Sequence, residues 1–317
     1  MFKSLFAALS PAGGSAHLST LIFHRVLPQP DPLFPGEVDA ARFDRICSWV
    51  KDWFNVLPLD EAAQRLQAGT LPSRALAITF DDGYADNHEV ALPILRRHAL
   101  PATFFVATGF LDGGRMWNDT VVEAVRNTRL DALDLRDLGD GRLGVYSLDK
   151  LADRQAAIRS ILSTAKYGAG LSRLNLTEQI AQRAQVTLPT DLMMTSGQVH
   201  ALHRAGMQIG AHTMSHPILA LLDDGDARAE ITGSKHCLES ILGQPVTLFA
   251  YPNGRPGEDY GPRDVKLVRE IGFSAAVSTA WGASGGSTDI HQLPRFTPWD
   301  PVRWRFGARL VRNMLSH

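Results

Sequence analysis

The chain has 317 residues, of which 44% are hydrophobic and 21% charged, and its formal net charge is -1. This composition is ordinary for a folded protein, and the length suffices for one large α/β domain or two smaller ones. The balanced charge, with no Lys/Arg tract, argues against nucleic acid as a partner. The cysteines Cys47 and Cys237 fit no metal-ligand spacing, and we do not expect a disulfide framework.

Residues 1–16 form a distinct leader segment. They contain one lysine and a short apolar run, Leu5–Leu9, followed by small residues. The run is shorter than the ~7–15 apolar residues of a signal-peptide core, so no signal peptide is predicted. We interpret the segment as a short helix capable of peripheral membrane contact. No apolar stretch approaches the ~20 residues that cross a bilayer, and we expect a cytoplasmic protein or one peripheral to the inner membrane.

Short apolar runs alternate with amphipathic stretches along the rest of the chain. The runs predict buried strands at Leu18–His24, Ala75–Phe80, Thr103–Ala107, Met207–Ala211, Thr247–Tyr251 and Ala275–Ser278. Apolar residues at helical spacing predict helices at Ala40–Trp53, Asp60–Gln67, Asn87–His98, Asp119–Arg129, Leu151–Lys166, Ser196–Ala205, Ala227–Leu242 and Asp264–Ile271. This alternation predicts βαβ units and a mostly parallel sheet.

One long interval departs from the alternating pattern. Residues 111–200 contain an Asp-, Leu- and Gly-rich stretch followed by helical patterns. We interpret them as a helical insertion, which serves as a lid, as a substrate wall or only as packing.

Two polar motifs follow predicted strands. Asp81 and Asp82 come directly after Ala75–Phe80, and His212 and His216 come after Met207–Ala211. The carboxyl ends of parallel strands meet at one edge of a sheet, so we expect these side chains to lie together. Adjacent carboxylates repel each other unless a cation or a shared proton intervenes. One carboxylate and two imidazoles form a three-ligand site suited to Zn²⁺ or non-haem iron, which leaves the other carboxylate as a general base.

These two motifs resemble the first and second motifs of the polysaccharide deacetylases (NodB homology domain, carbohydrate esterase family 4). The resemblance runs from Leu18 to Phe296 and implies, for residues 17–317, a distorted (β/α) barrel of about seven parallel strands with a helical insertion. It implies hydrolysis of N-acetyl groups in an amino-sugar-containing glycan. It also implies Asp81 as the catalytic base, and one divalent metal, most simply Zn²⁺, held by Asp82, His212 and His216.

The third motif of the family has a partial counterpart. Phe249–Gly254 resembles it, and the resemblance implies an oxyanion site at Tyr251 and Pro252, with the backbone N–H of Tyr251 as donor. The family often carries an arginine where this chain has Ala250. Arg295 is a candidate substitute, and an ordinary surface arginine is the alternative interpretation. The fourth motif, a tryptophan, has no clear match.

The general acid of the family is expected at an unusual place. A C-terminal Leu-x-His motif normally supplies it, and this chain has none there. Leu21–His24 is similar to that motif, as in a branch of the family with circularly permuted strand order. By this resemblance His24 is the general acid.

Two other functions remain open from the sequence. A glycan-binding protein of the same fold without turnover is one, favoured by the missing third-motif arginine. A metal-dependent hydrolase of small amides or O-acetyl esters is the other. The sequence does not distinguish a polymeric glycan from a lipid-linked one.

Overall fold

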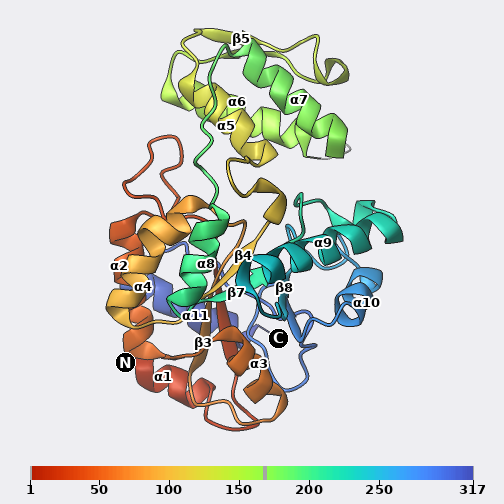
Figure 1. The fold of residues 1–317 in the computed structure, drawn as a ribbon. Helices are drawn as coiled ribbons and strands as arrows, with labels where there is room; N and C mark the ends of the chain where they lie inside the picture. The colour runs from red at the N-terminus through yellow and green to blue at the C-terminus, as the bar shows by residue number, and fades with distance from the viewer. Residues whose placement is uncertain (1, 167–169, 317) are drawn as a thin grey trace. The chain divides into compact units, whose positions relative to one another are not determined.

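A computed structural model describes residues 2–166 and 170–316 of the chain. The chain divides into two compact units (Figure 1). The barrel unit comprises Met1–Gln29, Val38–Asp112 and Met194–His317, and the helical unit comprises Pro30–Glu37 and Gly113–Met193. No helix among the described residues is long and apolar enough to cross a membrane.

The barrel unit is built on a parallel sheet. Its strands run in the order β1 (Leu18–Phe23), β3 (Ala75–Phe80), β4 (Thr103–Val106), β7 (Gln208–Ala211), β8 (Leu248–Ala250) and β9 (Ala275–Val277), and β2 (Asn55–Val56) pairs with the start of β3. Every pairing is parallel. The long strands β1 and β3 are buried throughout, as expected for parallel strands covered on both faces.

The segment Leu293–Phe296 links the two edge strands of this sheet. Its first residue exchanges backbone hydrogen bonds with β9, where the N–H of Leu293 donates to Ala276 at 2.9 Å. Its last residue does the same with β1, where the N–H of Phe296 donates to Thr20 at 2.7 Å. The sheet therefore closes on itself, and the predicted distorted (β/α) barrel is confirmed. We call this segment the closing segment.

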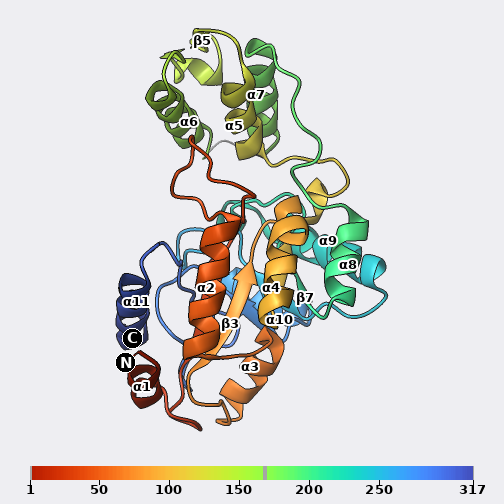
Figure 2. The ribbon, with the colours of Figure 1, turned by 90° about the vertical axis from the view of Figure 1, so that its left-hand side faces the viewer.

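Helices flank the strands of the barrel unit (Figure 2). They are α1 (Phe2–Leu9), α2 (Ala40–Trp53), α3 (Leu59–Gln67), the π-helix η1 (Asn87–Ala91) leading into α4 (Leu92–His98), η2 (Thr108–Phe110), α8 (Ser196–Arg204), η4 (Leu219–Leu221), α9 (Asp224–Leu242), α10 (Pro262–Glu270) and α11 (Arg303–Leu315). Their starts follow capping chemistry: Asp39 caps α2, Asp223 caps α9, and Thr195 forms a capping box with Gln198.

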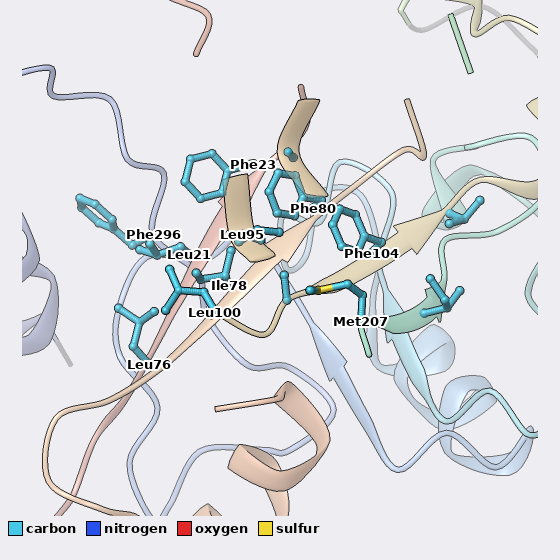
Figure 3. Close-up of a cluster of buried hydrophobic side chains, with 14 of the residues drawn as sticks. Leu21, Phe23, Leu76, Ile78, Phe80, Leu95, Leu100, Phe104, Met207 and Phe296 are labelled. Atoms are coloured by element: carbon cyan, nitrogen blue, oxygen red, sulfur yellow. The ribbon is translucent and has the colours of Figure 1, made fainter. Parts of the chain in front are cut away.

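Aromatic packing fixes the register between β1 and β3 (Figure 3). The ring of Phe80 stacks on Phe104 with centroids 4.6 Å apart and on Phe23 at 5.3 Å. In the sheet Phe23 is the register partner of Phe80. A slip by one residue would turn these rings to the opposite face, and each buried phenylalanine contributes about 1.5–3 kcal/mol. The residues after Phe23 and Phe80 are thereby held side by side.

The helical unit has a core of its own. It contains α5 (Trp117–Asn127), α6 (Leu151–Ala165), α7 (Gly170–Arg183), the 3₁₀ turn η3 (Gly139–Gly141) and an antiparallel pair, β5 (Ala132–Asp134) with β6 (Val145–Ser147). Its apolar cluster includes Val121, Ile158 and Ile180, together with Leu33 from the separate segment Pro30–Glu37. That segment is also tied by charge, since Arg126 donates to both carboxylate oxygens of Asp31 at 3.1 and 2.6 Å.

Candidate metal centre and active site

A sharp backbone turn follows β3 and carries the two adjacent carboxylates. The N–H of Asp81 donates to the carbonyl of Phe23 at 2.9 Å, which extends the β1–β3 pairing by one residue. Asp82 then adopts a left-handed conformation with φ +74°, and Gly83 follows with φ +90°. A Cβ on Gly83 would lie 3.0 Å from the side chain of Val106, so the turn needs glycine on both counts. Asp81 and Asp82 consequently meet different partners.

Asp82 lies against the two histidines of the second motif. The Nε2 atoms of His212 and His216 are each 3.4 Å from Oδ1 of Asp82. One potential ligand atom from each of the three residues lies within 4.8 Å of the others. Oδ1 of Asp82 is buried and has no hydrogen-bond partner among the described residues. A buried carboxylate oxygen without a proton donor is unfavourable, and a cation at this point would satisfy it. The residues present therefore fit a metal ion.

The orientation of His212 supports the same use. Its Nδ1 lies 2.7 Å from the carbonyl oxygen of Ala250, at the end of β8. A carbonyl only accepts, so this contact assigns the ring proton to Nδ1 and leaves the lone pair of Nε2 directed at Asp82. Metal-binding histidines are commonly oriented by a carbonyl in this way.

The loop that carries His216 is held by Glu230 of α9. One carboxylate oxygen of Glu230 accepts the backbone N–H groups of Met214 at 2.8 Å and Ser215 at 2.9 Å. Thr213 and His216 have φ values of +64° and +52°, which are strained for residues with a Cβ. Such strain persists only where surrounding contacts enforce it, and it gathers at functional sites. Sequence analysis missed Glu230, since nothing in its spacing from His216 signals the contact.

Asp81 forms a buried ion pair with Arg295. The guanidinium donates from Nη1 to Oδ1 and from Nη2 to Oδ2, both at 2.7 Å, and only 1% of Arg295 is exposed. Two further bonds fix the arginine, from Nε to the carbonyl of Ser278 at 2.8 Å and from Nη1 to the hydroxyl of Thr79 at 3.2 Å. Arg295 belongs to the closing segment. It is therefore a buried partner of Asp81, not a surface arginine.

The charges of the cluster act on one another. Burial raises the pKa of Asp81, but the positive charges of Arg295 and His212 outweigh it, and the pKa lies below its ordinary value. Burial also raises the pKa of Asp82, but the close contact with His212 and the charge of His216 outweigh it, and the pKa lies well below its ordinary value. Burial lowers the pKa of His216 to about 4, so this imidazole is neutral at neutral pH. The neutral form is the one that binds a metal.

His212 differs from His216 in its electrostatic environment. Burial lowers its pKa, but the carboxylates of Asp81 and Asp82 raise it more, and the net pKa is above the ordinary value. The carboxylates thus favour a positive charge between themselves and the imidazoles. A divalent cation would supply that charge without protonating a ligand.

His24 follows β1 in the position next to Asp81. Its side chain is exposed, and its charge contributes to lowering the pKa of both Asp81 and Asp82. The backbone of His24 is held by a side chain of η1: Nδ2 of the buried Asn87 donates to the carbonyl of His24 at 2.9 Å. Asp86 accepts the N–H of Val26 at 3.0 Å. The structure thus places an accessible imidazole at the edge of the cluster on a fixed backbone.

Tyr251 is the site residue whose predicted use needs correction. Its N–H donates to the carbonyl of Val277 at 3.2 Å, so it is engaged in the sheet and not free for an oxyanion. Its hydroxyl donates to His291 at 3.0 Å. Pro252 has no N–H. The next one belongs to Asn253, which has φ +57° and whose N–H has no hydrogen-bond partner within residues 2–166 and 170–316.

Comparison with known proteins places this chain in a family. The sequence profile of the family described as polysaccharide deacetylase matches residues 68–130 and 173–276, more than half of the chain. The Bacillus subtilis protein YxkH, named as a polysaccharide deacetylase, is 21% identical over 260 residues, which are 81% of this chain and 64% of that protein. The poly-β-1,6-N-acetyl-D-glucosamine N-deacetylase of Staphylococcus aureus is 24% identical over 179 residues, 55% of this chain and 60% of the relative. The chain thus spans less than two thirds of these relatives.

Solved structures share the fold over nearly the whole chain. The Streptococcus pyogenes deacetylase PplD, determined with acetate, has a TM-score of 0.61 at 19% identity and covers 94% of this chain and 98% of its own. IcaB from Ammonifex degensii has a TM-score of 0.60 at 18% identity, covering 94% and 97%. Together with the profile match, the fold and the two motifs lead to one conclusion: the chain belongs to the polysaccharide deacetylase family.

Proposed function

We propose that this chain is a metal-dependent hydrolase that removes N-acetyl groups from an amino-sugar-containing polysaccharide. The family consists of hydrolases acting on N-acetyl amide bonds of polysaccharides. The observation that carries the proposal for this chain is the pairing of two buried carboxylates with different partners. Asp81 is clamped by Arg295 at 2.7 Å, and beside it Asp82 faces His212 and His216.

One divalent metal belongs to the proposal. Asp82, His212 and His216 would hold it, and Zn²⁺ fits this donor set because catalytic zinc sites commonly use three nitrogen and carboxylate ligands with one position open. When bound there, such a cation would supply polarisation of the acetyl carbonyl and a lower pKa for an attacking water. Carboxylate and imidazole ligands also bind other first-row divalent metals. Elemental analysis of the purified protein is therefore the measurement that identifies the metal.

The residues of the chain then divide the proton transfers between them. Asp81 accepts a proton from the attacking water, and Arg295 keeps its carboxylate ionised and oriented. His24 gives a proton to the departing amine, because an imidazole readily exchanges protons near neutral pH. The N–H of Asn253 replaces that of Tyr251 as the donor to the developing oxyanion.

The proposed substrate class is taken from the name of a relative. The Staphylococcus aureus relative is a poly-β-1,6-N-acetyl-D-glucosamine N-deacetylase. We propose a polymer of N-acetylated hexosamine for this chain, and β-1,6-linked N-acetylglucosamine oligomers are the first substrate to test.

Acetate release decides between this function and its rivals. Purified protein loaded with Zn²⁺ is incubated with β-1,6- and β-1,4-linked N-acetylglucosamine oligomers, with Asp81→Asn as the matched control. Acetate from the wild type alone supports the proposal. Retention of oligomer without acetate would identify a glycan-binding protein. Faster release from small amides or acetyl esters than from any oligomer would identify a small-substrate hydrolase.

A further inference from the structure

Helices α1 and α11 form one outer face of the barrel unit. They lie side by side at one edge of that unit (Figure 2). The ring of Phe2 packs so closely against Gly307 that a Cβ there would fall 2.7 Å from it. The inner side of α11 is apolar and buried through Phe306, Leu310 and Met314. We call the opposite, outward side of these two helices the α1–α11 face.

The α1–α11 face exposes large apolar side chains. Trp304 and Leu315 are each 60% exposed, and Leu5 on α1 is 40% exposed. Trp304, Val311 and Leu315 follow helical spacing and lie in one stripe along α11, in which Val311 is partly buried against the core. Exposed apolar side chains gathered in this way usually mark an interaction site.

Basic side chains border this stripe. Arg305, Arg309 and Arg312 follow each other along α11, and Lys3 is exposed on α1. Neither helix contains an acidic residue, although the whole chain has 32 basic and 33 acidic residues. Arg309 is paired with Asp300. Within the described residues, Arg305 and Arg312 have no carboxylate partner.

We infer that the α1–α11 face docks on the surface of an anionic lipid bilayer. Amphipathic helices lie in such an interface with apolar side chains among the acyl chains and cations at the phosphates. Tryptophan concentrates at the headgroup level of membranes. A soluble polyanion would need the arginines but would gain nothing from Trp304 and Leu315. The apolar stripe therefore favours a bilayer, and its short length makes the attachment peripheral and reversible.

The docking is independent of deacetylation and is tested by vesicle sedimentation. We expect the full chain to sediment with vesicles of equal parts phosphatidylglycerol and phosphatidylcholine, but not with phosphatidylcholine alone. Each arginine near an anionic surface strengthens binding about fivefold, so Arg305→Glu with Arg312→Glu should weaken it about 30-fold or more. Trp304→Ser with Leu315→Ser should weaken it by a comparable factor.

Matched controls separate this face from the rest of the surface. Leu221→Ser removes a side chain that is 66% exposed on η4, and Arg204→Glu reverses an exposed charge on α8. Both controls should bind like the wild type, and circular dichroism checks that every variant is folded. Absence of wild-type binding to the anionic vesicles overturns the inference. Full vesicle binding by the Trp304→Ser/Leu315→Ser variant also overturns the inference. It would show that the face binds polyanions through its arginines alone.

Discussion

The two neighbouring carboxylates of the site lie in opposite surroundings. Asp81 meets the permanent charge of Arg295 through two bonds of 2.7 Å, whereas Asp82 meets two imidazoles at 3.4 Å and keeps one buried oxygen without a hydrogen bond. The protein itself compensates the charge of Asp81, and it leaves the charge of Asp82 for a cation. In the proposed mechanism these two adjacent residues therefore take different roles, Asp81 as the proton acceptor and Asp82 as a metal ligand.

The histidine side of this comparison is tested most strongly by removing a ligand. His212→Ala and His216→Ala each leave two of three donors, and we expect loss of bound metal and a fall of acetate release to background. Elemental analysis of the purified variants measures the metal. His236→Ala, which changes an exposed histidine on α9, is the matched control. Full metal occupancy in both ligand variants would show that the cluster is not the metal site.

The arginine side is tested by Asp81→Asn. The amide keeps the shape of the carboxylate but accepts no proton from water, so acetate release should fall by about 10²–10⁴. Metal content should stay at the wild-type level, in contrast to the histidine variants. A variant without metal would make Asp81 a ligand, and near-native turnover would remove it from the proton transfer.

The ion pair itself predicts a stability effect. Arg295→Met leaves the charge of Asp81 buried and uncompensated, and we expect the free energy of unfolding to fall by about 3–5 kcal/mol. In the double variant with Asp81→Asn the buried charge is gone, so part of the loss should return. Urea unfolding of the single and double variants measures this coupling. Strictly additive losses would mean that the two side chains do not stabilise each other.

His24 predicts a smaller and more selective effect. An amine leaves only with a proton, whereas an acidic alcohol leaves without one. We therefore expect His24→Ala to lower amide hydrolysis by about 10²-fold and to spare an acetyl ester with a good leaving group. Equal losses on both substrates would assign His24 to binding instead.

Asn87→Ala provides a companion measurement to His24→Ala. It removes the hydrogen bond to the carbonyl of His24 while leaving the imidazole in place. The rate of amide hydrolysis should again fall more than the rate of ester hydrolysis. The fall should be smaller than in His24→Ala, because Asn87→Ala loosens the backbone at His24 but keeps the imidazole.

The strands could be predicted because the sheet is parallel. Strands buried on both faces appear in sequence as continuous apolar runs, and Ala75–Phe80 was predicted with the bounds that the structure shows. The same holds for the helix Ala40–Trp53, which has a clear amphipathic period and an Asp39 cap. The proximity of the aspartate and histidine motifs could be predicted because each motif directly follows such an apolar run.

Other contacts have no counterpart in local sequence. The closing segment is short and contains Pro294, which disfavours a strand interior, so it was not predicted. Arg295 was named as a candidate, but its bidentate contact with Asp81 depends on tertiary closure. Helix α11 was also missed, although Phe306, Leu310 and Met314 have helical spacing. Tyr251 was misassigned as a donor because sequence alone does not show which N–H groups the sheet uses.

The closing segment ties chemical competence to completion of the fold. Arg295 and Asp81 are 214 positions apart in the chain, and their bond forms only when the segment joins the first and last strands of the sheet. A chain in which the two edges had not met would hold Asp81 without Arg295. The Asp81 carboxylate would then be neither fixed in place nor kept ionised by the guanidinium. The proposed catalytic base is therefore complete only when the two edges of the sheet have met.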